Sequence, residues 1–410
     1  MRRVVVTGMS TVNPIGNNIE EYWNNIVGNK IGFSPVRDIR ENISEDFEVK
    51  LAGDVKNFDP QKYIEKKECK RLDRFTQFAV YCAKDVLAQT EYVIDDPYRC
   101  GVILGCGIGG LDLTLSEHEK YLDKGPGRIS VFYVPMMIAN MAAGCVSINT
   151  GFKGANYAAV TACASSANAI GEAFQKIKHG YLDSCLCGGT ESCISEFTLG
   201  SFNNMRALTR SSDPYRASVP FDKQRNGFVL GEGAAVLLLE EYEHAVKRGA
   251  KIYAEIAGYG ATCDGYHITS PAPDGKAVAA AMKAALQEAG IDGVPDYINA
   301  HGTSTELNDK YETTAIKLAF GDKAHDIKIN STKSMTGHLL GAAGAIEAVA
   351  VILQMNNSLI HRTVGYSVPD EECDLDYCVN GNVQMQIRTA LSNSLGFGGH
   401  NACLCFKKEE

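Results

Sequence analysis

The sequence predicts a mixed α/β fold made of two related halves, each a sheet covered by helices. Three features of the chain support this prediction. Short apolar runs of strand length alternate with segments of helical periodicity. The order of these elements in residues 1–250 returns in residues 251–410. Each of these parts also has a strand that ends in a turn of small residues before a helix. We therefore expect two domains with these boundaries.

The bulk composition narrows the class of protein. The chain has 410 residues and a hydrophobic fraction of 45%, which are enough for a large core. Its formal net charge of -9 argues against general binding of nucleic acid. No apolar run is long enough to cross a bilayer, and the run Val4–Val6 is too short for a signal peptide. We expect a cytoplasmic protein that binds neither nucleic acid nor membrane.

The 14 cysteines indicate reduced thiols rather than disulfides or zinc ligands. The pairs Cys185/Cys187 and Cys403/Cys405 lie in apolar runs, where both members of a pair face the same side of a strand. We interpret them as small core residues. The sequence has no Cys-x-x-Cys pair and no His-Glu-x-x-His segment, so we expect no metal.

In the first half, apolar runs bounded by glycine or polar residues predict strands, and apolar residues three and four apart predict helices. Residues 31–60 are mixed, with Pro and Asp turns, and predict a loop-rich excursion. Gly231-Glu232-Gly233 separates two apolar runs and predicts a hairpin between 228–230 and 234–239. The other expected elements are a strand at 3–7, a helix at 18–28, a long helical region at 62–87, a strand at 100–105, a helix at 136–146, a strand at 157–160, a helix at 172–178 and a strand at 184–191.

The second half repeats this order. The run 251–258 resembles the opening strand, and the run 296–300 with its small-residue turn resembles 100–107. A strand at 327–330 leads into a Gly- and Ala-rich helix at 338–355, as the strand at 157–160 leads into its helix. Residues 384–406 predict a strand, a turn at 396–399 and another strand, which corresponds to the hairpin expected in the first half.

Cys163 lies at the centre of the small-residue turn that follows the strand at 157–160. Small neighbours allow a substrate to approach, and the N-terminus of a helix favours a thiolate. Backbone N–H groups at such a turn can stabilise an oxyanion. These features predict a nucleophile, and a buried structural cysteine is an equally good interpretation of the local sequence alone.

Two histidines and a lysine occupy corresponding turns in the second half. His301 follows the strand at 296–300, and Lys333 and His338 follow the strand at 327–330. Taken singly, each histidine is better explained as a hydrogen-bonded structural residue. Both nevertheless end strands where an α/β sheet binds its ligands. A cysteine with two imidazoles and a lysine suits acyl-transfer chemistry.

Five segments of the chain are specific enough to suggest a family: 161–166 (Thr-Ala-Cys-Ala-Ser-Ser), 220–229 (Pro-Phe-Asp-Lys, then Arg225 and Gly-Phe-Val), 299–305 (Asn-Ala-His-Gly-Thr-Ser-Thr), 330–338 (Asn-Ser-Thr-Lys-Ser-Met-Thr-Gly-His) and 393–399 (Asn-Ser-Leu-Gly-Phe-Gly-Gly). With them the chain resembles, nearly end to end, the β-ketoacyl-acyl-carrier-protein synthases. Within that family it is most similar to the type II elongating condensing enzymes of bacterial fatty-acid synthesis. The resemblance implies a thiolase-like fold, with two related halves in a five-layered αβαβα arrangement, and usually a homodimer.

The resemblance implies a reaction in two stages. Cys163 takes an acyl group from an acyl carrier protein. Malonyl-carrier protein then loses CO2, and its carbanion attacks the acyl thioester to give a 3-oxoacyl product that is longer by one two-carbon unit. His301 and His338 would stabilise the enolate. Lys333 would orient the histidines, and Glu312 matches the acidic residue that pairs with it.

The substrate contacts are also implied by the resemblance. Phe397 would gate the acyl pocket, and its N–H would join that of Cys163 in the oxyanion hole. Thr303 and Thr305 match positions that bind pantetheine, and Thr269 is expected to contact substrate. No resident cofactor is implied, because phosphopantetheine arrives on the carrier protein. The acyl pocket is expected to draw on Ile108, Tyr133, Ala162 and Phe202.

The basic run in the helical region at 62–87 forms a positive cluster on an acidic chain. We expect it to dock the acidic acyl carrier protein, with a solvated helix face as the alternative. The expected docking residues are Lys66, Lys67, Lys70, Arg71, Arg128 and Arg206.

Several residues depart from the family pattern. Ser166, Leu395 and His400 stand where glycine, phenylalanine and threonine are common, and Ala155 stands where proline is usual. None of them belongs to the Cys–His–His set, so they concern acyl-chain preference more than the chemistry.

Other functions fit parts of the pattern. A ketosynthase of a polyketide-type pathway shares these motifs. A thiolase would need a second cysteine in the turn at 396–399, which holds Phe397 instead. A cysteine hydrolase needs neither the lysine nor two histidines. A non-catalytic subunit like the chain-length factors would lack the nucleophile, and Cys163 is present.

Overall fold

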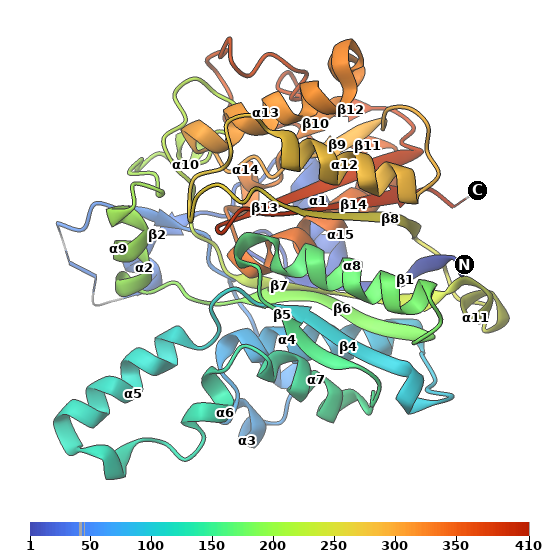
Figure 1. The fold of residues 1–410 in the computed structure, drawn as a ribbon. Coiled ribbons are helices and arrows are strands. Elements are labelled where there is room, and N and C mark those ends of the chain that lie inside the picture. The colour runs from blue at the N-terminus through green and yellow to red at the C-terminus, as the bar shows by residue number, and fades with distance from the viewer. Residues whose placement is uncertain (41–42, 45, 410) are drawn as a thin grey trace.

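The computed structural model describes residues 1–40, 43–44 and 46–409. Among these residues, ten strands form one mixed sheet in the order β10-β9-β13-β14-β8-β1-β7-β6-β4-β5 (Figure 1). The first half contributes β1 (Val4–Val12), β4 (Cys100–Gly105), β5 (Asn156–Ala159), β6 (Ser184–Glu191) and β7 (Gly233–Glu241). The second half contributes β8 (Ala254–Cys263), β9 (Tyr297–Asn299), β10 (Lys328–Asn330), β13 (Thr389–Gly396) and β14 (His400–Lys407).

The two half-sheets have the same topology. When the strands of each half are numbered along the chain, both halves have the order third, second, fourth, fifth, first from the outer edge. In both, the third, second and fourth strands are parallel, and the fifth is antiparallel to its two neighbours. The halves meet where Val4–Val6 of β1 pair with residues 254–256 of β8. This arrangement confirms a mixed α/β fold with two related halves.

Helices cover both outer faces and fill the space between the half-sheets, which gives five layers (Figure 1). α4 and α7 pack on the first half-sheet, and α12, with α13 beside it, covers the second. α8 and α15 lie between the half-sheets and contact strands of both. The bounds of these helices are α4 (Arg74–Thr90), α7 (Met141–Thr150), α8 (Ser165–Lys178), α12 (Lys276–Glu288), α13 (Glu306–Phe320) and α15 (Ala343–Asn357).

Small residues allow the two central helices to pack closely. α15 is buried from Ala343 to Met355, as expected for a helix that is apolar on all sides. A Cβ atom on Gly344 would come within 3.0 Å of the Ala167 backbone nitrogen in α8 and within 2.7 Å of Ser394 Oγ in β13. The Gly- and Ala-rich composition thus brings the N-termini of both helices to the centre of the molecule, next to β13.

The remaining elements connect or decorate these layers. No helix in the described residues has both the length and the apolarity needed to cross a membrane. The elements that connect or decorate the layers are α1 (Ile19–Val27), β2 (Ser34–Pro35), α2 (Val36–Ile39), β3 (Leu51–Ala52), η1 (Pro60–Lys62), α3 (Lys66–Cys69), η2 (Pro97–Arg99), α5 (Leu111–Lys124), η3 (Pro126–Arg128), α6 (Tyr133–Met137), η4 (Ala162–Ala164), α9 (Glu196–Asn204), α10 (Pro214–Ala217), α11 (Tyr242–Lys247), η5 (Gly321–Asp326), α14 (Lys333–Thr336), η6 (Leu340–Ala342), β11 (Leu359–Ile360) and β12 (Val383–Gln384).

Three predicted elements differ from the structure. The helix expected at 136–146 is divided into α6 and α7. The helical region expected at 62–87 is divided into α3 and α4, because Asp73 caps the N-terminus of α4 by accepting a hydrogen bond from the Phe75 N–H. The hairpin expected around Gly231-Glu232-Gly233 is wrong. β7 pairs with β1 and β6, and the segment before it forms isolated bridges, Phe228 with Leu208 and Leu230 with His338. The hairpin expected in the second half is confirmed as β13 and β14.

Candidate active site

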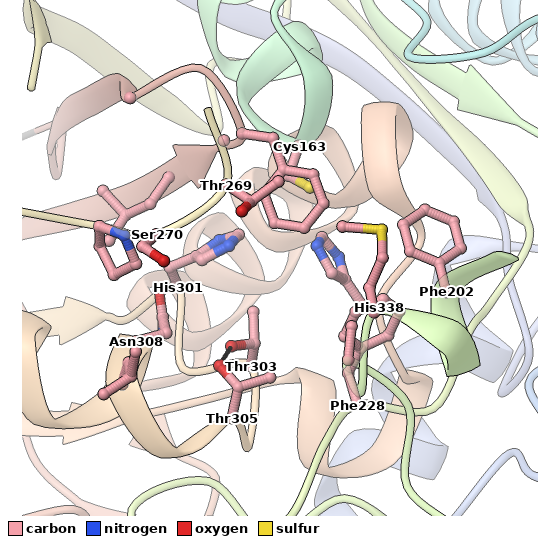
Figure 2. Close-up of a pocket in the computed structure, with 18 of the residues that line it drawn as sticks. Cys163, Phe202, Phe228, Thr269, Ser270, His301, Thr303, Thr305, Asn308 and His338 are labelled. Atoms are coloured by element: carbon pink, nitrogen blue, oxygen red, sulfur yellow. Dashed lines mark hydrogen bonds between the residues drawn. The ribbon is translucent and has the colours of Figure 1, made fainter. Parts of the chain in front are cut away.

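A cavity of about 630 Å³ opens between the two halves and contains the residues expected to carry the chemistry. Cys163 reaches it from the first half, and His301 and His338 reach it from the second (Figure 2). Phe202, Thr269, Thr303, Thr305 and Phe397 also line it, as expected.

Cys163 is held in a strained turn between β5 and α8. Ala162 has φ of 49°, a conformation that costs energy for a residue with a Cβ atom and turns the chain just before Cys163. Ser165 Oγ secures the turn, since it accepts from the Thr161 N–H at 2.9 Å and donates to the Ala162 carbonyl at 2.7 Å. A Cβ on Gly396 would lie 2.6 Å from the Thr161 carbonyl, so only glycine fits beside this turn.

Burial acts on the Cys163 thiol in the opposite direction to the helix N-terminus, which the sequence led us to expect would favour a thiolate. Burial raises its pKa to about 12. The Lys333 charge opposes this rise, as do the backbone N–H groups of Phe397 and of Cys163 itself, while Glu191 adds to it. The helix N-terminus does not outweigh desolvation, because the thiol is only 9% exposed. The proton must therefore leave when the sulfur attacks. Both N–H groups lower the pKa of the Cys163 thiol, which agrees with an oxyanion site beside the sulfur.

His301 and His338 face each other as neutral imidazoles. Their ring centroids are 5.2 Å apart and the rings are nearly perpendicular. Figure 2 shows both rings on the same side of Cys163. Burial, followed by the positive charge of Lys333, lowers both pKa values well below 6.5. A neutral imidazole can donate one N–H bond, so the pair can offer two donors to one developing oxyanion.

Lys333 supports His301 and is paired with Glu347, a partner that the sequence did not suggest. Lys333 Nζ donates to Glu347 Oε1 and lies 3.4 Å from His301 Nδ1. If Lys333 donates to Nδ1, His301 keeps its proton on Nε2. One signal could have identified Glu347, because it is the single charged residue in the otherwise uncharged segment Ala343–Asn357.

Glu312 does not pair with Lys333, which corrects the expectation from the family resemblance. Its carboxylate accepts from the backbone N–H groups of His301 and Gly302, both at 2.9 Å, and from Asn393 Nδ2 at 3.2 Å. Burial raises its pKa to about 7. Glu312 thus holds the backbone of the turn that carries His301 rather than the lysine.

The predicted acyl-pocket residues divide into two groups. Phe202 lines the cavity, and Ala162 belongs to the strained turn. Ile108 is 37% exposed and lies outside the cavity, with its N–H donating to Glu191. Tyr133 begins α6, where its hydroxyl donates to Thr114 Oγ1 at 3.3 Å. In a single chain these last two residues do not reach the cavity.

The expected docking residues are exposed and lie at two places. Arg206 lines the mouth of the cavity. The others belong to α3, to the residues after it and to the turn before α6, where Arg71 lies over the ring of Phe132 at 5.1 Å. Within the described chain none of the expected docking residues forms an ion pair, so their charges are available to a partner. They are Lys66, Lys67, Lys70, Arg71, Arg128 and Arg206.

Comparisons with known proteins agree with this fold and site. Residues 1–245 match the family model "Beta-ketoacyl synthase, N-terminal domain", and residues 253–367 match "Beta-ketoacyl synthase, C-terminal domain". A Synechocystis protein named 3-oxoacyl-[acyl-carrier-protein] synthase 2 is 47% identical over 99% of this chain and 98% of its own length. A Staphylococcus aureus protein of the same name is 47% identical over 100% of this chain and 99% of its own.

Solved structures of the same family superpose over the whole chain. A β-ketoacyl synthase from Burkholderia phymatum has a TM-score of 0.92 at 32% identity, and covers 100% of both chains. A ketosynthase in complex with its type II PKS acyl-carrier protein has a TM-score of 0.89 at 35% identity, again over 100% of both chains. These matches confirm the thiolase-like fold expected from the sequence. The chain belongs to the β-ketoacyl synthase family, and it is a condensing enzyme of the acyltransferase class.

Proposed function

We propose that the chain condenses an acyl group on Cys163 with malonyl-acyl carrier protein and gives 3-oxoacyl-acyl carrier protein in fatty-acid elongation. The observation that supports this most strongly is a buried cysteine that shares one cavity with two neutral imidazoles. The two curated relatives at 47% identity carry the name of this reaction.

In the first stage, the Cys163 sulfur attacks the carbonyl carbon of the acyl thioester on the carrier protein. The C–S bond to pantetheine breaks, and the thiol proton of Cys163 goes to the departing pantetheine thiolate. The N–H groups of Cys163 and Phe397 bind the oxyanion that forms between these steps. We propose that the Phe397 ring gates the acyl pocket, since it lines the cavity beside the nucleophile on a glycine-flanked turn.

In the second stage, the C–C bond to the malonyl carboxylate breaks and CO2 leaves. The electron pair forms an enolate, whose oxygen accepts N–H bonds from His301 and His338. The enolate carbon then attacks the acyl carbonyl on Cys163, and the cysteine leaves as a thiolate that regains a proton. Lys333 keeps His301 in the tautomer that donates from Nε2.

The pantetheine arm brings the thioester, so we propose that no resident cofactor takes part. Thr303 and Thr305 support binding of the arm, because their hydroxyl groups are 2.9 Å apart in the cavity wall and leave hydrogen-bonding capacity free for it. Thr269 lies on the loop that forms the opposite side of the mouth.

An acyl carrier protein is the proposed macromolecular partner. A similar ketosynthase is known in complex with a type II PKS acyl-carrier protein. Here the exposed cations of α3 and of the following residues, with Arg128 and Arg206, would attract an acidic partner to a chain whose net charge is -9.

A homodimer is also part of the proposal. β5 lies at the outer edge of the first half-sheet, and an open edge readily pairs with a second chain. Val160, which follows β5, is 57% exposed, and Ile148 of α7, a helix that packs against β5, is 78% exposed. A second copy would cover them and bring its own α6 region, with Tyr133, toward the acyl pocket. A cytoplasmic location agrees with the 14 free cysteines.

The direct test is an assay of the purified protein with malonyl-acyl carrier protein and a panel of acyl-carrier proteins, with products resolved by mass. One two-carbon extension per turnover supports elongation. Repeated extension without reduction would favour the polyketide-type alternative, which the similar ketosynthase in complex with a type II PKS acyl-carrier protein brings into consideration. The absence of any condensation in a Cys163→Ala variant is the matched control, and activity in that variant would contradict the proposal.

A further inference from the structure

Glu191 is a completely buried carboxylate directly behind the active site, and the mechanism does not use it. It is the last residue of β6 and is 0% exposed. In the described chain no lysine, arginine or histidine lies within ion-pair distance of it. Its oxygen atoms accept instead from the four backbone N–H groups of Gly107 at 2.7 Å, Ile108 at 3.2 Å, Gly109 at 3.3 Å and Gly341 at 3.1 Å.

These four donors come from both halves of the molecule. Gly107 to Gly109 form the turn after β4, whereas Gly341 lies in η6, three residues after His338. The two turns touch, because a Cβ atom on Gly341 would lie 2.2 Å from the Gly107 nitrogen. One carboxylate thus joins the two halves at the place where the active site is assembled.

Strained residues flank this junction. Leu340 has φ of 46° and lines the cavity between His338 and the Gly341 N–H. Ala162, with φ of 49°, precedes Cys163, and its carbonyl lies 3.6 Å from the position of a Cβ on Gly107. Residues in this region of φ/ψ persist only when surrounding contacts hold them. The Glu191 carboxylate supplies such a contact next to Leu340, because it accepts from the Gly341 N–H.

We infer that Glu191 is a positioning residue for the condensation reaction, whose carboxylate clamps the turn after β4 to the turn after His338 and thereby sets the place of His338 relative to Cys163. The clamp has a cost, since a negative charge near Cys163 opposes formation of the thiolate, as does burial. The inference rests on the proposed roles of Cys163 and His338.

Two substitutions separate the reach of Glu191 from its charge. Glu191→Asp keeps the charge but withdraws the oxygens by about 1.5 Å, so they no longer span both turns. We expect faster amide hydrogen exchange at Gly107 and Gly341 and a loss of condensation of about tenfold or more. Glu191→Gln keeps the length but removes the charge, so the pH midpoint for alkylation of Cys163 by iodoacetamide should fall by about half a unit or more. Neither variant substitutes Lys333, His301 or His338.

Glu240→Asp is the matched control. Glu240 is a buried carboxylate at the opposite end of the same β6–β7 ladder, where it binds Arg248, far from the nucleophile. This variant should leave hydrogen exchange at Gly341 and the alkylation midpoint unchanged. If Glu191→Asp condenses at the wild-type rate and its amide hydrogen exchange is unchanged, the inference is overturned. The inference is also overturned if Glu240→Asp loses condensation and gains exchange to the same extent. If the wild-type protein itself does not condense, the proposed function fails, while hydrogen exchange still tests the clamp.

Discussion

At the scale of single residues, the proposed decarboxylation requires two imidazoles that remain neutral. His301 and His338 meet this requirement because both are buried next to the positive charge of Lys333. Each would donate to the enolate oxygen, and the loss of one such donor costs about 2.7–4 kcal/mol. We expect His301→Ala and His338→Ala to slow malonyl decarboxylation by about a hundredfold or more. Acylation of Cys163, measured by intact mass, should change little. Normal decarboxylation in both variants would contradict the assigned role.

The Lys333–Glu347 pair should contribute to stability as well as to catalysis. Both side chains are almost completely buried, so Glu347→Gln leaves an uncompensated ammonium and should lower the free energy of unfolding by about 3–5 kcal/mol. Lys333→Met combined with Glu347→Leu removes both charges and should restore most of that stability without restoring condensation. Urea unfolding measures the first effect. A single variant as stable as wild type would contradict the paired arrangement.

His361 provides a pH test of burial. Desolvation lowers its pKa from 6.5 to about 4, and the Arg362 carbonyl partly opposes this. Above pH 6.5 the ring is neutral in both states. As the pH falls from 6.5 toward 4, the unfolded chain takes up a proton that the folded chain does not, so stability is lost in that window. Between about pH 7 and pH 4.5, wild type should lose about 2 kcal/mol more than His361→Gln, which cannot titrate. Equal losses in urea unfolding would show that the ring is not buried as described.

Most of the proposed catalytic residues could be predicted from the sequence because each stands at a small-residue turn after an apolar strand. Cys163, His301 and His338 share the cavity for that reason. The partner of Lys333 could not be read in the same way. Glu347 lies in the central helix α15, and its pairing depends on how that helix packs under the turn that carries Lys333. Glu312, which is nearer in sequence to His301, binds backbone N–H groups instead.

At the scale of elements, the bounds of the strands were easier to predict than which strands pair with each other. β4 and β6 have the limits that their apolar runs indicate, Cys100–Gly105 and Ser184–Glu191. The hairpin expected before β7 fails because the bridge of Leu230 is to His338, more than a hundred residues away. Local pattern shows that a segment is extended, but only the tertiary fold decides what it pairs with.

The basic element α3 allows a test of docking. Charge reversal of Lys66 and Lys67 adds repulsion toward an acidic carrier protein without removing an ion pair of the described chain. The KM for acyl-carrier substrates should rise, whereas turnover of a small acyl-pantetheine thioester should stay close to wild type. The difference should shrink at high salt, because exposed charges are screened. Reversal of Lys276, a cation at the N-terminus of α12 that is paired with Asp274, is the control. An equal effect on both substrate types would contradict docking at α3.

At the scale of the whole molecule, the repeated topology explains why the site lies at the centre. Each half has a strand-to-helix turn that leads toward a central helix, and these two helices, α8 and α15, pack together between the half-sheets. The proposed nucleophile Cys163 thus comes from one half, and the imidazoles of His301 and His338 come from the other. The repeat could be predicted from the order of apolar runs. The edge-to-edge junction of β1 with β8 could not, because it involves three residue pairs without a distinctive sequence.

In the proposed reaction, Cys163 carries the acyl group and passes it to a decarboxylated malonyl unit. The enzyme is first incubated with acyl-acyl carrier protein, and malonyl-acyl carrier protein is then added. Peptide mapping by mass spectrometry before and after this addition locates the acyl group. We expect the acyl mass on the peptide that contains Cys163 and on no peptide that contains another of the 14 cysteines. That mass should disappear on addition of malonyl-acyl carrier protein, together with release of CO2 and a 3-oxoacyl product two carbons longer. An acyl group on another cysteine, or product formed while Cys163 remains acylated, would contradict the account.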